Sequence, residues 1–227
     1  MVQLPPEAVG AGQNLMPPPT DKELVRRVRR GDREAMGQLV DRHYAPVLNF
    51  VARFVGRTES ANDLAQETFV KVIRRLESFD DRADLRTWIF AIAANACRDA
   101  MRRAKRRPEL TEADGPDLQL IRDFAEDTDD AGKPAAMLDR KLRANQVRRA
   151  VASLPDLHRE VVVLRFFHDL SLKEIAEVCH CSIGTVGSRL HYAVKRLARE
   201  LGPELGDAGG IGDEVLGDQT APAGTRG

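Results

Sequence analysis

The sequence is poor in cysteine and in long apolar runs, and each shortage excludes a class of protein. Its 227 residues include three cysteines (Cys97, Cys179 and Cys181), too few for the disulfide framework of a secreted domain. No apolar run approaches the roughly 18 residues that a membrane-spanning helix needs. The N-terminus has no basic segment followed by an apolar stretch, so we expect no signal peptide. We therefore predict a cytoplasmic protein that does not insert into a membrane.

Strand patterns and catalytic groupings are missing as well. No segment alternates apolar and polar residues as a strand does, and every long pattern has helical period, which predicts an all-α fold. Aromatic residues make up 5% of the chain against 42% for all apolar residues, so we expect mostly aliphatic cores. The sequence shows no nucleophile with a paired base, no phosphate-binding Walker loop and no carboxylate cluster in an apolar setting. We therefore predict a protein that is not an enzyme and needs no cofactor.

The formal net charge is zero, but the charges are segregated along the chain. Residues 21–107 carry 20 Lys and Arg against 13 Asp and Glu, and residues 138–201 carry 12 against 7. Between them, residues 108–137 carry 2 against 9, and residues 202–227 carry 1 against 5. Two basic blocks around an acidic segment suggest two domains that each meet a polyanion, although solvated Arg-rich helix faces would give the same counts.

Helical signals and breaks divide the chain into five parts. The capping-box spacing of Thr20–Glu23 and the break at Gly31-Asp32 begin two helices, and Pro46 is expected to kink or divide the second. A third helix has Val70 and Ile73 among its predicted inward residues, and a fourth ends in "RRAKRRP". The predicted parts are a disordered N-terminal extension (1–19), a small helical domain (20–107), a flexible acidic linker (108–137), a second small helical domain (138–201) and a disordered acidic, Gly-rich tail (202–227).

The stretch Ser171–Leu197 has the spacing of a helix-turn-helix. Ser171 and Glu174 form a capping box that begins a helix at Leu172, and Ser182 can cap a second helix shortly afterwards. Helices joined by so few residues must cross sharply. The second helix presents hydroxyls, amphipathic rings and cations outward, which suit phosphates and base edges. Its predicted inward stripe is Ile183, Val186, Leu190, Val194 and Leu197.

The bend between these helices contains Cys179-His180-Cys181, which raises the alternative of a metal or redox site. A structural zinc site needs four ligands, usually in two separated pairs. The nearest further candidates, His168 and His191, form no recognised pattern with this segment. Cys179 falls on the apolar stripe, where a buried thiol acts as a small hydrophobe. We therefore interpret the segment as a bend and predict no metal.

Four motifs along the chain carry a family resemblance. They are "DLAQETFVKVIRRLESF", "RADLRTWIFAIAANACRDAMRR", "LPDLHREVVVLRFFHDLSLKEIAEV" and "IGTVGSRLHYAVKRL", in this order. Together they resemble the extracytoplasmic-function (ECF, group 4) sigma factors of bacterial RNA polymerase, within the sigma-70 family. The resemblance covers about residues 20–107 and 138–200 and leaves out the linker and both tails.

The resemblance implies that residues 20–107 are sigma region 2, which binds the polymerase and opens the −10 element. The motif for the clamp of the β′ subunit is similar to Asp63, Gln66 and Glu67, although these residues could simply form a solvated helix face. The loop that holds an extruded base corresponds to Asp80–Arg86, with Asp80, Asp81 and Arg82 as candidate DNA contacts. The helix that holds the strand backbone carries Asn95, Arg98, Arg102 and Arg103.

The resemblance also implies that residues 138–201 are sigma region 4, which reads the −35 element. The positions that match the family's DNA contacts are Arg165, Lys173, Thr185, Ser188, Arg189, His191, Tyr192, Lys195 and Arg196. Two departures stand out. His180 replaces a glycine that is usual in the bend, so either it adopts a left-handed backbone or the turn differs. Gly187 and Tyr192 replace residues that are often basic. The implied partners are core RNA polymerase, through the β′ clamp and the β flap, promoter DNA and an anti-sigma factor.

Two rival functions remain open from the sequence. A stand-alone helix-turn-helix regulator would use residues 20–107 as an effector or dimerisation domain and would read a palindromic site as a dimer. An enzyme or redox sensor would depend on its three cysteines. Neither rival accounts for the order of the four motifs.

Overall fold

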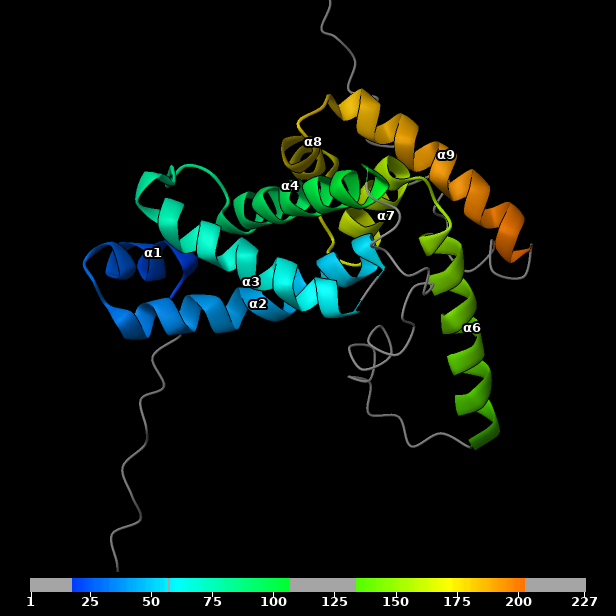
Figure 1. The fold of residues 1–227 in the computed structure, drawn as a ribbon, viewed down its shortest axis with the longest axis horizontal. Coiled ribbons are helices and arrows are strands. Elements are labelled where there is room, and N and C mark those ends of the chain that lie inside the picture. Colours follow the sequence, from blue (N-terminus) through cyan, green and yellow to red (C-terminus); the bar gives the residue numbers. More distant parts are fainter. Residues whose placement is uncertain (1–17, 57, 107–133, 203–227) are drawn as a thin grey trace, which may run out of the picture.

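The computed structural model describes residues 18–56, 58–106 and 134–202, and its regular elements are all helical (Figure 1). The predicted all-α class is confirmed for these ranges. Residues 1–17 of the predicted N-terminal extension, most of the linker and the tail from residue 203 onward lie outside them. The helices are α1 (Asp21–Arg29), α2 (Arg33–Val55), α3 (Thr58–Arg75), the short 3-10 helix η1 (Leu76–Ser78), α4 (Leu85–Arg106), α6 (Pro134–Ala152), α7 (Asp156–Phe166), α8 (Leu172–Cys179) and α9 (Ile183–Leu201).

The helix starts of the N-terminal unit, α1–α4, follow the predicted caps. The Thr20 hydroxyl accepts a hydrogen bond from the Glu23 N–H at 3.3 Å, and the Asp32 carboxylate accepts one from the Ala35 N–H at 3.0 Å. Gly56 ends α2 in the left-handed conformation, with φ of 72°, which a residue without a side chain adopts at little cost. Pro46 lies inside α2 without dividing it, and the helix packs against α1, α3 and α4.

The core of this unit is largely aliphatic, but phenylalanines occupy its centre. Phe50, Phe54 and Phe90 are fully buried, and the Phe50 ring lies 5.6 Å from Phe54 and 5.5 Å from Phe90, measured between centroids. Such tilted and edge-to-face pairs add to the stability from buried area alone. A low aromatic content overall is therefore compatible with an aromatic cluster, because three of the phenylalanines meet at one place in the core.

The C-terminal unit, α6–α9, is built around α9, which packs against α6, α7 and α8. α6 begins at Pro134, within the predicted linker, and proline suits a first helical position because its missing N–H has no partner there in any helix. Val161, Val163, Ile175 and Leu190 are fully buried at the centre of the unit. None of the described helices is long and apolar enough to cross a membrane.

The two units pack directly on each other. α4 lies against α8, and α2 lies against α7. In Figure 1, the green α4 lies beside the brown α8. The buried apolar side chains of both units form one continuous cluster. The described parts of the chain therefore form one body from two helical units.

Candidate polymerase and DNA interfaces

The helix-turn-helix is held by a cap at the start of each helix. The Ser171 hydroxyl accepts from the Glu174 N–H at 3.3 Å, and the Glu174 carboxylate accepts from the Ser171 N–H at 2.7 Å, which completes the predicted capping box. Ser182 caps α9 by accepting from the Thr185 N–H at 3.1 Å. His180 ends α8 with φ of 50° and ψ of 47°, so the residue that departs from the family's glycine does adopt the left-handed backbone.

The outer face of α9 takes no part in the hydrophobic core. Val186, Leu190 and Ala193 are its buried residues. Away from them, a group of predicted DNA-contacting side chains is exposed: Ser188, His191, Tyr192, Lys195 and Arg196. The predicted inward position of Ile183 is wrong, since this side chain is 43% exposed. It occupies the first residue of α9, where the helix has just left the bend.

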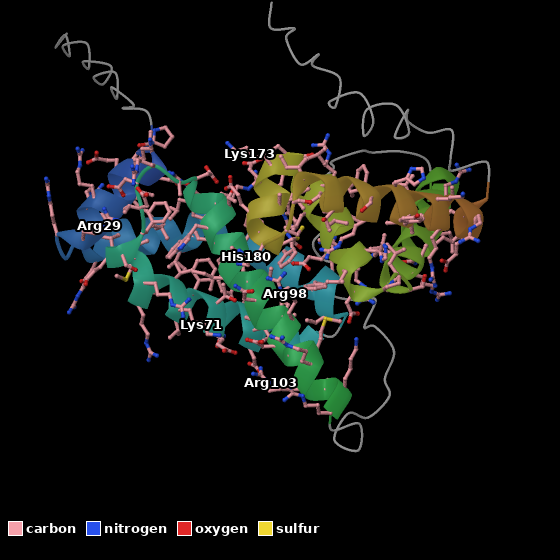
Figure 2. The ribbon with its side chains drawn as sticks, turned by 90° about the horizontal axis from the view of Figure 1, so that it is seen from above. Arg29, Lys71, Arg98, Arg103, Lys173 and His180 are labelled. Carbon is pink, nitrogen blue, oxygen red and sulfur yellow. The ribbon has the colours of Figure 1, made fainter. Side chains whose placement is uncertain are left out.

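Most of the other side chains of this unit that are predicted to contact DNA already contact other groups of the protein. The Arg165 guanidinium donates to the Leu170 carbonyl at 3.2 Å and so ties α7 to the turn before α8. Arg189 is half-buried, with a guanidinium nitrogen 3.9 Å from the Cys181 sulfur. The Thr185 hydroxyl lies 2.8 Å from the Ser182 hydroxyl. Lys173 is exposed at the start of α8 (Figure 2).

α3 presents a mixed polar and apolar face to solvent. Asp63, Gln66 and Glu67 are exposed, and the Glu67 carboxylate pairs with Lys71 at 2.6 Å. Val70 is 46% exposed and Ile73 is 37% exposed, so their predicted inward positions are wrong. They follow Gln66 at four and seven residues, which places them on its face of the helix. Leu64, Ala65, Thr68, Phe69 and Val72 cover the core instead.

The predicted base-holding loop, Asp80–Arg86, borders a hollow. The Asp80 carboxylate accepts hydrogen bonds from the Arg82 backbone and guanidinium, and these bonds lower the pKa of Asp80. Asp81 accepts two hydrogen bonds from the Arg29 guanidinium, each 2.9 Å long. The hollow has a volume of about 420 Å³, and its lining residues are Thr20, Asp21, Lys22, Val25, Phe79, Arg82, Ala83, Asp84 and Leu85.

The sequence does not predict that α1 lines one side of this hollow. Asp21, Lys22 and Val25 read as an ordinary helix start, and nothing in their spacing connects them with a loop some sixty residues later. The Arg29 contact with Asp81 and η1 brings α1 to the loop. A Lys or Arg with no Asp or Glu one turn away along its helix is a weak sequence signal for an ion pair with a distant segment.

The polar side chains of α4 have different surroundings. Arg102 pairs with Asp99 one turn earlier, and Arg103 is exposed near the end of the helix (Figure 2). Asn95 is exposed and accepts from the Arg98 guanidinium at 2.5 Å. Arg98 also donates to Glu160 of α7 at 2.9 Å, so this predicted DNA contact is held by the other unit.

The three cysteines are free thiols. Cys97 and Cys179 are buried, and burial raises the pKa of both, with the charge of Glu160 adding to the effect. A thiol with a raised pKa is a poor nucleophile and a poor metal ligand at neutral pH. In the part of the chain that the structure describes, no cluster of three or more His, Cys, Asp or Glu could hold a metal ion.

Comparison with known families assigns both units. The model of sigma-70 region 2 matches residues 39–107, and that of sigma-70 region 4 matches residues 144–197. The RNA polymerase sigma-H factor of Pseudomonas aeruginosa is 33% identical over 83% of this chain and 97% of its own length. The chain belongs to the sigma-70 family, among the ECF sigma factors. It directs initiation by RNA polymerase and, as a sigma factor, is not itself an enzyme.

Other ECF sigma factors align over similar lengths. The sigma-E factor of Escherichia coli K12 is 32% identical over 81% of this chain and 95% of its own length. SigW of Bacillus subtilis is 28% identical over 79% and 96%. The solved structure of CnrH in complex with the cytosolic domain of CnrY is 27% identical, covers 80% of this chain and 96% of CnrH, and superimposes with a TM-score of 0.55. We therefore call α1–α4 region 2 and α6–α9 region 4.

Proposed function

We propose that this sigma factor reads two promoter elements, the −10 element with region 2 and the −35 element with region 4. The observation that carries the proposal is the exposed outer face of α9. The N-cap and the buried residues of this helix do not involve Ser188, His191, Tyr192 or Lys195, so these side chains are available to bind DNA. A helix-turn-helix places such a face in the major groove, where side chains reach base edges. Lys173, Arg165 and Arg196 then surround this face as phosphate contacts.

Region 2 opens the −10 element by holding an extruded base. The hollow beside Asp80–Arg86 falls within the range of about 300–1,000 Å³ that small-ligand sites occupy, and Lys22 and Arg82 give it positive charge next to its acidic residues. An extruded base needs such a pocket, together with cations that hold the strand beside it. Arg102, Arg103 and Asn95 on α4 supply the strand contacts.

The α3 face binds the clamp of the β′ subunit, and region 4 binds the β flap. Asp63, Gln66 and Glu67 are exposed next to Val70 and Ile73, and an apolar pair within a polar rim is the usual composition of a protein interface. The same surfaces are open to a protein partner, as in the CnrH–CnrY complex, and we propose that this partner is an anti-sigma factor. Since these partners are cytoplasmic components, we place the protein in the cytoplasm.

In vitro transcription tests the proposal. Core polymerase from the source bacterium, supplied with fragments of its genome, should give defined transcripts only when this protein is added. A mutant with Tyr192→Ala and Lys195→Ala serves as the matched control, since it keeps the buried stripe of α9 and should lose −35-dependent transcripts. If the protein instead binds a palindromic duplex tightly without polymerase, it is a stand-alone regulator and the proposal fails.

A further inference from the structure

The outer face of α1 carries a row of basic side chains. Leu24 and Val25 are the residues of α1 that are buried in the core. Lys22, Arg26 and Arg30, the last of which is the C-cap residue, are exposed on the other side of the helix. Four residues advance about 6 Å along a helix and return to nearly the same face, so the three cations form one line.

This row begins at the hollow beside the loop Asp80–Arg86. Lys22 and Arg82 both line the hollow. Near the other end of α1, the Arg29 guanidinium reaches the same loop at Asp81 and also contacts η1. The helix therefore lies beside the loop from its first turn to its last, at the end of region 2 that is farthest from α9 (Figure 1).

Most of the positive charge in this row is not neutralised by the protein. Arg33, the first residue of α2, is exposed and continues the charge beyond Arg30. The carboxylates on this side of region 2 are mostly paired with other arginines, in the pairs Asp21–Arg42, Glu23–Arg26, Asp32–Arg27, Asp80–Arg82 and Asp81–Arg29. Among the described residues, no ion pair involves Lys22, Arg30 or Arg33. Glu34 is exposed next to Arg33, but it accepts a hydrogen bond from Gln38 at 3.1 Å. Three cations are therefore available to an external anion.

The arrangement of these cations suits an extended polyanion rather than a compact one. From Lys22 to Arg30, the row covers about 12 Å of helix surface at 1.5 Å per residue. A free phosphate or a carboxylate is bound by donors that converge on one point. A single strand of nucleic acid instead meets successive cations along a charged track. Because the row starts at the hollow that we assign to an extruded base, the strand that carries this base is the polyanion it would meet.

The positions of the helices indicate which part of the strand passes α1. α4 starts at the hollow with Leu85 and carries Asn95, Arg102 and Arg103 progressively farther along the helix. Figure 2 shows Arg29 and Arg103 at different ends of region 2. α4 packs against region 4, which we assign to the upstream −35 element, and α1 lies on the other side of the hollow. The strand at α1 is therefore the part downstream of the −10 element.

We propose that Lys22, Arg26, Arg30 and Arg33, the α1 row, bind the phosphates of the opened strand immediately downstream of the −10 element. This inference rests on the proposed function for the base in the hollow and extends the path of that strand towards the transcription start. Contacts to phosphates carry no sequence information, so the α1 row holds the strand open without selecting its bases.

A double variant of the full chain tests the α1 row in the holoenzyme. Arg30→Ala with Arg33→Ala removes two unpaired cations and leaves Lys22 in the hollow unchanged. Arg149→Ala with Arg199→Ala is the matched control, because it makes the same charge change at exposed positions of α6 and α9. Circular dichroism and titration with core polymerase check that both double variants fold and form holoenzyme.

Two labelled DNA forks from a promoter that the holoenzyme transcribes serve as probes. The short fork ends directly after the −10 element, and the long fork continues the non-template strand as a single-stranded tail of about eight nucleotides. We expect the row variant to bind the long fork about three- to tenfold more weakly than the control variant. Its slope of log affinity against log salt should be smaller by about 1.4, the value for two phosphate contacts at about 0.7 each on a single strand. The two variants should bind the short fork equally.

Neutral phosphates in the tail locate the contact. A methylphosphonate placed at one tail linkage at a time should weaken binding of the control variant at the linkages that face the α1 row. The same substitutions should have little effect on the row variant, because its cations at these linkages are already missing. Contacts between the tail and core polymerase are present in both holoenzymes and therefore cancel in this comparison.

Three results would overturn the inference alone. Equal affinity of the two variants for the long fork would show that the α1 row does not bind the tail. An equal loss on both forks would show a general charge effect. Methylphosphonates with the same effect in both variants would place the tail phosphates elsewhere. A holoenzyme that does not prefer the short fork over one with a scrambled −10 element would overturn the proposed function, and the inference with it.

Discussion

Individual side chains on the outer face of α9 divide into those that can read bases and those suited to phosphates. His191 and Tyr192 carry amphipathic rings, lie 5.8 Å apart between centroids, and sit one turn beyond Ser188. Lys195 follows further along the helix with a single flexible charge. Base edges offer directional donors and acceptors, whereas phosphates offer charge that is the same at every step. The two groups should therefore have different effects when they are removed.

We expect His191→Ala or Tyr192→Ala to change which −35 bases are preferred, at a cost of about 1–3 kcal/mol for a contacted base. Lys195→Ala should weaken all promoters alike and lower the slope of log affinity against log salt by about one unit. Transcription from a library with a randomised −35 element distinguishes these effects. An unchanged preferred sequence in both ring variants would remove these side chains from base recognition.

His180 is a residue whose backbone conformation costs stability. It is not glycine, yet it has φ of 50°, a conformation that side chains with a Cβ disfavour. We predict that His180→Gly raises the free energy of unfolding by about 0.5–1 kcal/mol. Glu177→Gly, with helical φ on the same helix, should lower it by about 1 kcal/mol. Urea unfolding followed by circular dichroism measures both, and equal signs for the two variants would contradict the prediction.

At the scale of the helices, the sequence predicts the helix caps. It does not predict which neighbour covers each apolar side chain. The caps of α1, α2, α8 and α9 form as predicted, because a cap depends on residues three positions apart. The inward positions of Val70, Ile73 and Ile183 failed. An apolar stripe shows that a helix has an apolar face, but not whether the same chain, another protein or solvent meets the edge of that face.

The exposed α3 face gives a prediction for polymerase binding. Gln66→Ala with Glu67→Ala should weaken binding to core polymerase by roughly tenfold or more, since interface energies concentrate in few residues. The melting temperature should stay nearly unchanged, because both side chains are exposed. Fluorescence titration with core measures the first effect and calorimetry the second. Glu77→Ala, an exposed carboxylate on η1, is the control; a similar loss there would indicate general charge rather than a defined site.

At the scale of the whole molecule, the sequence predicts two domains but not their packing on each other. Glu160 and His168 lie in a stretch whose apolar residues already account for its helix, and nothing local marks them as contacts of α4. Arg98 is predicted to contact DNA, and the structure shows its guanidinium paired with Glu160 of the other unit. Contacts between residues more than sixty positions apart, made by polar side chains, leave no periodic signature.

Acidification should open the molecule through His168. Its ring is enclosed by Phe50 and Phe90, and burial, followed by the charges of Arg53 on α2 and Arg86 on α4, lowers its pKa from 6.5 to about 3. The packed arrangement of the two units therefore disfavours the protonated ring. The contribution of neutral His168 to this packing is complete above pH 6.5 and is lost progressively as the pH falls from 6.5 towards 3.

Glu160 acts in the opposite direction and must be separated from this effect. Burial raises the pKa of Glu160, so protonation of this carboxylate favours the packing of the two units on each other. His168→Phe keeps a ring beside Phe50 and Phe90 but cannot bind a proton, and it leaves Glu160 in place. Between pH 7.5 and 5.5, we expect the ratio of molecules with separated units to molecules with packed units to rise about tenfold in the wild type relative to His168→Phe, equivalent to about 1.4 kcal/mol. X-ray scattering across this range measures the ratio. Parallel pH profiles for the two proteins would show that His168 is not the group that titrates with opening.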